Sequence, residues 1–324
     1  MIFVLLALAL IFDFLNGFHD SSNVVATPIS SNSMRPRLAL LLAAVAHFVA
    51  PFLFGVAVAT TIGEDLLNVD VLPVSAINAA LAAAIVWNLI TWYVGIPSSS
   101  SHALVGGLVG AAVVAEGVDA INPSGMLRVV TALLLSPLLG LAFGYLTMRV
   151  VLLAVRGSAP SVNTFFKRSQ VFTLTGLSLS HGTNDAQKTM GVITMGLVAA
   201  GVLDTFAVPL WVIFLSASAI ALGTFFGGWR LIRTLGGKIY RIRPVHAFSS
   251  QVSGASVIFG AALLGGPVST TQVMSSSIMG VGAADRIKMV RWGILREFGT
   301  AWALTIPVTA VLAGVIYLLI SAID

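Results

Sequence analysis

Five long apolar runs constrain this chain more than any other feature of its sequence. They cover residues 38–62, 71–94, 126–148, 206–226 and 292–320, and a membrane-spanning helix needs about 20 apolar residues. Only 9% of the 324 residues are charged, whereas about 25% are charged in a soluble domain. Within lipid every backbone polar group needs a partner inside the protein, which helices provide. The runs therefore predict an all-α polytopic membrane protein of about 10–12 membrane segments.

The N-terminal run, residues 1–12, is apolar as well. It lacks a basic first segment and a small-residue cleavage site, so it is expected to be a retained membrane segment and not a removed signal peptide. The stretch before Asn16 would be about 22 Å long as a helix. A hydrocarbon core is about 30 Å thick. We therefore expect the first span to be interrupted at Asn16.

Basic and acidic residues alternate between the loops that join these runs. The net charge is +5, but its loop placement indicates membrane topology and not nucleic-acid binding. With basic loops cytoplasmic, both termini would be extracytoplasmic in a multi-pass protein of the plasma (inner) membrane. The chain has no cysteine, which excludes disulfides and thiolate metal sites. The basic loop residues are Arg35, Arg37, Arg149, Arg156, Lys167, Arg168 and those in 230–243 and 286–291; the acidic ones are Glu64, Asp65, Asp70, Glu116, Asp119 and Asp204.

The apolar runs repeat with opposite direction. In the orientation given above, run 38–62 leaves the cytoplasm and run 206–226 enters it, and the later runs pair in the same inverted way. Inverted duplication is typical of secondary transporters with discontinuous helices, which bind substrate near the membrane midplane between the repeats. We predict a first repeat over residues 1–155, a cytoplasmic connector over 156–168 and a second repeat over 169–324, which together form one transmembrane transport domain.

Two polar motifs interrupt the apolar sequence at related positions. Residues 16–23 read NGFHDSSN and residues 181–188 read HGTNDAQK, so that Asp20 and Asp185 are 165 positions apart. A carboxylate inside a membrane segment is costly and by default functional. The alternative is that each Asp is a structural acid that caps a broken helix. The duplication favours one site built from two halves.

A second duplicated motif contains helix-breaking residues followed by hydroxyls. Residues 95–102 read GIPSSSSH and residues 265–272 read GGPVSTTQ. Each Gly-x-Pro is expected to end one helix, and the hydroxyl run to begin the next. The free N–H groups at a helix start attract anions. Irregular backbone at this depth must line a cavity or be buried in protein, so we expect both helix starts to converge near the midplane as re-entrant helices.

With these motifs in this order, the chain resembles the inorganic phosphate transporter (PiT) family over essentially its whole length. The resemblance implies a symporter for inorganic phosphate driven by Na⁺ or H⁺, with an inverted repeat, re-entrant hairpins, no cofactor beyond the coupling ion, and a homodimer. Two positions depart from the family pattern: Gln272 replaces a common His, and Gln251 replaces a membrane-embedded Glu. The resemblance places phosphate ligands at Asn23, Ser99, Ser100, Ser101, Asn184, Ser269, Thr270 and Thr271, and functional carboxylates at Asp20 and Asp185.

Electrostatics suggests how such a site would couple two solutes. Phosphate is an anion, and two like charges about 4 Å apart repel by about 4 kcal/mol at an effective dielectric near 20. Na⁺ at Asp20 and Asp185, or protons on them, would remove that repulsion. Asp13 is expected either to bind a coupling ion or to play a local structural part, because Ser178 stands at its duplicated position. Lys188 either neutralises phosphate or pairs with Asp185.

The remaining polar residues have weaker assignments. The hydroxyls of both runs could instead bond to the preceding helical turn. His47 is expected to be packed in mid-span, and not to relay protons. His102 would orient its hydroxyl run or titrate. The auxiliary polar residues of the predicted site are Asn16, His19, His102, His181 and Gln272.

Three other functions deserve comparison with phosphate symport. A sulfate permease of the same family is the nearest alternative, but an ionised Asp can accept the hydrogen of a protonated phosphate and only repels sulfate. A membrane hydrolase is disfavoured, because there is no Gly-x-Ser-x-Gly elbow and every motif occurs twice. A channel fits poorly with two interrupted halves. We therefore predict a transporter and not an enzyme.

Overall fold

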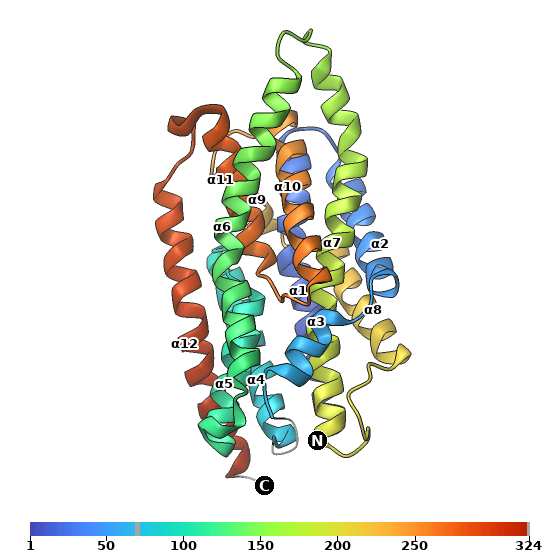
Figure 1. Cartoon of the computed structure of the whole chain (residues 1–324), viewed down its shortest axis with the longest axis vertical. Helices are drawn as coiled ribbons and strands as arrows, with labels where there is room; N and C mark the ends of the chain where they lie inside the picture. The colour runs from blue at the N-terminus through green and yellow to red at the C-terminus, as the bar shows by residue number, and fades with distance from the viewer. Residues whose placement is uncertain (69–71, 323–324) are drawn as a thin grey trace.

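The described part of the chain, residues 1–68 and 72–322, consists of helices and the segments that join them in the computed structural model, with one isolated β-bridge between Leu67 and Ile121 (Figure 1). The predicted span start at residue 71, Asp70 and the last two residues of the second repeat lie outside it. The helices in order are α1 (Ile2–Ser30), α2 (Pro36–Leu53), α3 (Ala57–Thr60), η1 (Thr61–Asp65), α4 (Val74–Val94), α5 (Ser100–Glu116), η3 (Val118–Ala120), α6 (Pro123–Ala154), α7 (Val162–Ala199), α8 (Leu210–Phe226), α9 (Trp229–Gly237), α10 (Pro244–Leu263), α11 (Thr270–Arg286), η4 (Ile287–Met289) and α12 (Gly293–Ser321).

The predicted all-α polytopic membrane fold is confirmed. Among the described residues, five helices are long and apolar enough to cross a membrane, namely α1, α2, α4, α6 and α12. A sixth span arises if α8 and α9, which meet at an angle of 67°, are counted together. The more polar or shorter helices α5, α7, α10 and α11 supply the rest of the predicted 10–12 or so segments.

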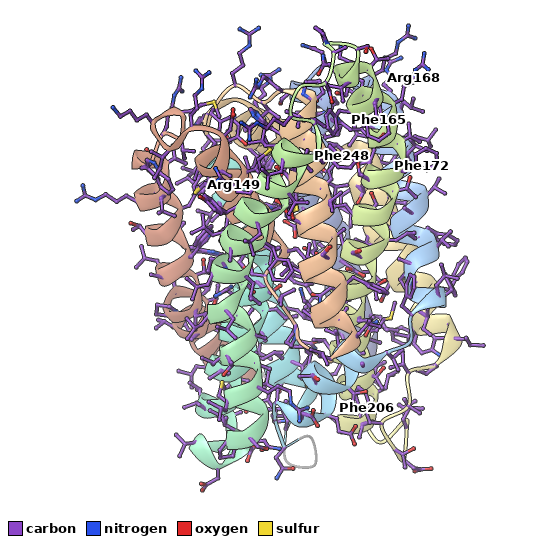
Figure 2. The ribbon with its side chains drawn as sticks, turned by 45° about the horizontal axis from the view of Figure 1, so that its top comes forward. Arg149, Phe165, Arg168, Phe172, Phe206 and Phe248 are labelled. Carbon is purple, nitrogen blue, oxygen red and sulfur yellow. The ribbon has the colours of Figure 1, made fainter. Side chains whose placement is uncertain are left out.

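Corresponding helices of the two halves run in opposite directions (Figure 1). Helix α1 rises from the end that holds both termini and α7 descends toward it, while α6 rises and α12 descends. Helix α7 begins at Val162, within the expected connector over 156–168. Figure 2 shows nitrogen-tipped side chains gathered at the opposite end of the molecule, where Arg149 and Arg168 lie. We call this the basic end.

Two helical hairpins enter the molecule from opposite ends. The pair α4–α5 has its outer ends near the termini, and the pair α10–α11 has them at the basic end (Figure 1). Gly95 and Gly265 turn the chain at the two tips with φ of 79° and 69°, values that favour glycine because it has no Cβ. After each tip, a serine caps the next helix: Ser99 accepts from the N–H of His102 and Ser269 from that of Gln272. These are the expected helix starts.

The prediction that the first span breaks at Asn16 is wrong. Helix α1 continues through the polar motif to Ser30, and α7 likewise continues through residues 181–188. Some side chains of the motifs bond to other elements while the backbone stays helical, as Asn23 does to Thr271 and Asn184 to the Gly266 carbonyl. The break lies instead inside the apolar run 38–62, where α2 ends at Leu53 and Gly55 has a φ of 76° before α3 begins.

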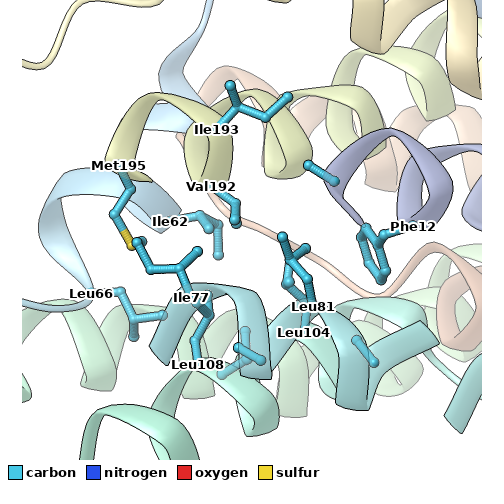
Figure 3. Packing of buried hydrophobic residues seen from close by; sticks show 14 of the residues in the cluster. Phe12, Ile62, Leu66, Ile77, Leu81, Leu104, Leu108, Val192, Ile193 and Met195 are labelled. Atoms are coloured by element: carbon cyan, nitrogen blue, oxygen red, sulfur yellow. The ribbon is translucent and has the colours of Figure 1, made fainter. Parts of the chain in front are cut away.

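The apolar core is divided into two large clusters on either side of the polar motifs. Figure 3 shows part of the first cluster, in which Phe12, Ile62 and Leu81 lie close to residues of α5 and α7. The second cluster includes Val24 of α1 and Leu174 of α7. Along both long helices the polar motif therefore falls between the two clusters, at mid-height. The apolar packing thus holds a polar site near the middle of the membrane.

The glycine of each motif lets a neighbouring helix approach the site. A Cβ at Gly17 would overlap the carbonyl oxygen of Ile220 on α8, and one at Gly182 would lie 2.9 Å from the Cα of His47 on α2. Each is closer than a real side chain tolerates, so both positions require glycine. The motif helix of one half therefore packs directly on the second span of the other half.

Candidate functional site

The two aspartates of the duplicated motif meet at the centre of the molecule. Asp20, His181 and Asp185 each offer one ligand atom within 4.8 Å of the others. His181 Nε2 lies 3.2 Å from Asp185 Oδ2 and 3.9 Å from Asp20 Oδ2. All three side chains are fully buried. The prediction of one site from two halves matches this geometry, since α1 supplies one carboxylate and α7 the other.

Both carboxylates accept hydrogen bonds from the start of α11. Thr271 Oγ1 donates to Asp20 Oδ1 at 2.9 Å. Thr270 Oγ1 lies 3.0 Å from Asp185 Oδ2 and 3.3 Å from Asp20 Oδ2, and its single hydrogen can serve only one of them at a time. A hydroxyl turn from one hairpin therefore bridges the two acids.

Lys188 is held by three short contacts. Its Nζ lies 2.5 Å from Asp185 Oδ1, 2.7 Å from Ser101 Oγ and 2.9 Å from the carbonyl oxygen of Val268. An ammonium group has three donors, so all of them are in use. Of the two expectations for Lys188, this structure shows the pairing with Asp185. The equivalent position in the first motif is Asn23, which donates to Thr271 Oγ1 at 3.0 Å.

The two helix starts touch each other. Ser269 Oγ donates to Ser99 Oγ at 2.7 Å. His102 Nδ1 is 2.8 Å from Ser99 Oγ, and Gln272 Nε2 is 3.5 Å from His102 Nε2. The backbone N–H of Ser269 donates to Ser136 Oγ on α6 at 3.0 Å. The predicted convergence of the hairpins thus occurs tip to tip, with the hydroxyls bonded to one another.

Other predicted residues surround this centre. Ser100 Oγ donates to Asn16 Oδ1 at 2.6 Å, and Asn184 Nδ2 donates to the carbonyl oxygen of Gly266 at 3.0 Å. His19 Nδ1 lies 3.4 Å from Asp20 Oδ1. The structure therefore gathers the predicted ligands and auxiliary residues around Asp20 and Asp185.

Asp13 is placed differently from the other two acids. It lies on α1 about two turns before Asp20, and it is fully buried. Among the described residues neither of its carboxylate oxygens has a hydrogen-bond partner. A buried carboxylate without a partner is expensive as an anion. Asp13 is therefore a place where a proton or a cation would be stabilised.

Sequence reasoning did not connect three residues to the site, although each contacts it or the helices next to it. His47 of α2 stacks on His181 with ring centroids 5.0 Å apart and its Nδ1 is 2.7 Å from Thr224 Oγ1. Gln187 and Ser21 bond to the backbone of α3 and α9. Their position inside the duplicated motifs was the available signal for Gln187 and Ser21, whereas nothing local pointed from His47 to His181.

The buried charged groups of this centre are unequal in number. Asp20 and Asp185 bring two negative charges and Lys188 one positive charge, all buried. Within a low-dielectric interior this leaves an excess of negative charge close to where the hairpin tips would receive an anion. Two inverted halves, two re-entrant hairpins and a charged site at mid-height define the class of protein: a membrane transporter built from inverted repeats.

The chain belongs to the phosphate transporter family. The model of that family, described as "Phosphate transporter family", matches it twice, over residues 16–159 and 154–313. The "Probable low-affinity inorganic phosphate transporter" of Bacillus subtilis (strain 168) is 47% identical over 97% of this chain and 96% of its own length. A protein of the same description from Rhizobium meliloti (strain 1021) is 44% identical over 97% and 94%. Membership confirms the resemblance seen in the motifs and the expectation of a transporter and not an enzyme.

A solved structure has the same fold. "The sodium-dependent phosphate transporter" superimposes with a TM-score of 0.89 at 26% identity, and the match covers 100% of this chain and 99% of the other. The inverted, hairpin-containing architecture predicted from the sequence is therefore shared along the whole chain.

Proposed function

We propose that this protein carries inorganic phosphate into the cell together with a cation, and that Na⁺ is the cation. The observation that supports this most is the pair of buried carboxylates bridged by the hydroxyls of Thr270 and Thr271. Carboxylate and hydroxyl oxygens are suited to a hard cation such as Na⁺. The names of the relatives point to phosphate, and that of the solved structure points to sodium.

In this proposal, a cation must bind before phosphate does. A Na⁺ between Asp20 and Asp185 would accept their oxygens as ligands and cancel the excess negative charge. The hydroxyls of Thr270 and Thr271, now bonded to the carboxylates, would turn toward the cation or the anion. Lys188 would then attract phosphate while it stays paired with Asp185.

Phosphate would bind at the hairpin tips. The starts of α5 and α11 offer backbone N–H groups and the positive ends of two helix dipoles, which together favour an anion. Asn23 and Asn184 lie next to these tips through their bonds to Thr271 and to the Gly266 carbonyl. The predicted ligands Ser99, Ser100, Ser101 and Ser269 lie on the same two turns.

Asp13 is the third acid of the proposed coupling path. Its buried, unpartnered carboxylate would hold a second Na⁺ or a proton. A proton is the alternative to Na⁺ at Asp13, as H⁺ coupling is the alternative to Na⁺ coupling for the whole transporter. The imposed gradients in the experiment below discriminate between them.

The two repeats would alternate access to this site across the plasma membrane. With the basic end in the cytoplasm, following the positive-inside rule, both termini would be extracytoplasmic. The repeat boundaries at 1–155 and 169–324, the cytoplasmic connector at 156–168 and the homodimer are parts of this proposal. Sulfate transport is the alternative, which the acceptor carboxylates disfavour because sulfate carries no proton near neutral pH.

The test is phosphate uptake into proteoliposomes that contain the purified protein. Labelled phosphate should accumulate under an inward Na⁺ gradient and not under a proton gradient, and unlabelled sulfate should not compete. Asp20→Asn and Asp185→Asn should abolish Na⁺-driven uptake. Asp119→Asn, at an exposed acid of η3, is the control and should leave it unchanged. Uptake that sulfate abolishes, or that needs no gradient, would refute the proposal.

A further inference from the structure

Each half of the molecule contains one broken span, and the two breaks correspond. In the first half α2 ends before Gly55, and α3 and η1 follow at residues 57–65. In the second half α8 ends before Gly227, and α9 follows. Both glycines have positive φ, 76° and 71°. A short segment follows each break: α3–η1 in the first half and α9 in the second. The two segments lie on opposite sides of mid-height, with α9 toward the basic end (Figure 1).

Helix α9 belongs to the second half but lies against the hairpin of the first. Thr234 Oγ1 donates to the carbonyl oxygen of Gly95, at the tip of α4–α5, at 3.1 Å. Arg230 donates to the carbonyl oxygen of Tyr93 in the last turn of α4. The same helix contacts α1, where a Cβ at Gly236 would overlap the hydroxyl of Ser30. Helix α9 therefore covers the α4–α5 tip from the basic end.

The segment α3–η1 makes the corresponding contacts with the other hairpin and the other motif helix. It belongs to the first half and lies against the α10–α11 tip, where a Cβ at Gly265 would be 3.1 Å from Thr61 Oγ1 and 3.3 Å from the carbonyl oxygen of Ala57. It also packs on α7, because a Cβ at Gly191 would lie 2.5 Å from the carbonyl oxygen of Ala59. Each broken segment thus seats on the hairpin tip and the motif helix of the opposite half.

One side chain of each polar motif fixes the adjacent break. Gln187 Oε1 accepts from the N–H of Val58 at 2.8 Å and from that of Ala59 at 3.3 Å, and its Nε2 donates to the carbonyl oxygen of Gly55 at 2.7 Å. Gln187 therefore links the break itself, at Gly55, to the helix α3 that follows it. Ser21 Oγ accepts from the N–H of Gly228, at the start of α9, at 2.9 Å.

These two side chains are also the immediate neighbours of the ion and substrate residues. Gln187 stands between Asp185 and Lys188 on α7, and Ser21 follows Asp20 on α1. With both segments seated, Asp20 and Asp185 are 0% exposed and Lys188 is 2% exposed. Thr61 and Thr234, on the segments themselves, are 2% and 5% exposed. The site is closed from both ends at once.

We propose that α3–η1 and α9 are the two gates of the transporter, and that Gln187 and Ser21 are the positioning residues that connect each gate to the site. A small displacement of α7 at Asp185 would pull on the backbone around Gly55 through Gln187. A displacement of α1 at Asp20 would pull on Gly228 through Ser21. One gate would open toward the end with the termini, the other toward the basic end. The link to site occupancy, unlike the gates themselves, rests on the proposed function.

The chain contains no cysteine, so gate opening can be measured with single introduced thiols. Thr61→Cys reports on α3–η1 and Thr234→Cys on α9, and a membrane-impermeant thiol reagent is applied from either side of proteoliposomes. In the otherwise native chain both thiols should react slowly. Adding Gln187→Ala should speed reaction at residue 61 by about tenfold or more, because three backbone groups lose their partner, two of them the buried N–H groups of Val58 and Ala59. Reaction at residue 234 should stay within about twofold.

Ser21→Ala should have the reciprocal effect, with faster reaction at residue 234 and little change at residue 61. Ser21→Thr keeps the hydroxyl and should restore slow reaction. Two matched controls remove a buried hydrogen bond elsewhere on the same helices: Ser22→Ala, whose hydroxyl bonds only to the carbonyl of His19, and Gln170→Ala, which bonds to Ser33 and Pro244. Neither should change either thiol.

The gate assignment and its link to Na⁺ and phosphate can fail independently, and the experiment distinguishes the two failures. If Gln187→Ala and Ser21→Ala each speed both thiols equally, the residues are only structural and the gate assignment is overturned. If each acts on its own gate, the gates are supported whatever the substrate is. In the single-cysteine proteins without a second substitution, Na⁺ with phosphate should change the reaction at one gate. If that gate is α3–η1, Gln187→Ala should remove the change at residue 61, and if it is α9, Ser21→Ala should remove it at residue 234. Selective gates that ignore Na⁺ and phosphate would support the gates and count against the proposed function.

Discussion

Replacing Asp20 by Asn should uncouple phosphate binding from Na⁺. The ligand atoms of Asp20 and Asp185 lie within 4.8 Å of each other. At that distance from Asp20 and an effective dielectric near 20, one negative charge of a bound phosphate would be repelled by about 3.5 kcal/mol, which corresponds to a factor of about 300 in a binding constant. In the proposed mechanism, Na⁺ would relieve this repulsion. Asn has the same shape and keeps an acceptor for Thr271, so the fold should survive the change.

Phosphate affinity measured by calorimetry with and without Na⁺ gives the test. In the native protein Na⁺ should raise the affinity by two to three orders of magnitude, within the range set by a repulsion of about 3.5 kcal/mol. In Asp20→Asn the two affinities should agree within about threefold, a difference under 1 kcal/mol. Asp119→Asn, at an exposed acid, should behave like the native protein. An Asp20→Asn protein that kept the full Na⁺ dependence would refute the electrostatic account of coupling.

Three further substitutions probe packing, the helix start and the buried cation. Gly17→Ala should lower the melting temperature, since a Cβ there overlaps the Ile220 carbonyl and overpacking costs about 1–3 kcal/mol; Gly176→Ala, with nothing within 4 Å, should not. Ser269→Ala should raise the KM for phosphate several-fold in uptake assays, because losing a helix cap costs about 1 kcal/mol; an unchanged KM would argue against a role of the α11 start. Lys188→Met should lower the melting temperature, since removing one partner of a buried ion pair costs about 3–5 kcal/mol of stability, and it should weaken phosphate binding in calorimetry, because the site keeps both carboxylates and loses the cation paired with Asp185; unchanged phosphate affinity would contradict its role.

The duplicated motifs were informative because membrane sequence has so little polar content. Against an apolar background, Asp20 and Asp185 stand out without any knowledge of the fold. Their matching positions in the two motifs, together with the opposite direction of the surrounding runs, predicted that the two aspartates would meet, and they do. The hairpin tips were predictable for a similar reason, since Gly and Pro followed by hydroxyls have few roles inside a bilayer.

Helix breaks were harder to predict from the sequence. The polar motif of α1 was expected to interrupt the helix, and the apolar run 38–62 was expected to continue. The reverse holds: α1 stays helical through its motif, while the carbonyl oxygen of Gly55 at the break accepts a hydrogen bond from Gln187, a residue 132 positions away. Local propensity carries no record of such a distant partner.

The sequence by itself determined the all-helical membrane fold, the inverted duplication and the residue types of the site, because lipid allows so few backbone solutions and penalises every buried charge. Only the tertiary structure decided which partners those residues have. It placed Lys188 on Asp185 and Ser101, joined Ser99 to Ser269 and seated each broken segment on the opposite half. Such contacts depend on how helices far apart in the chain pack together, and hydrogen-bond partners across a helix interface leave no periodic signal in either helix.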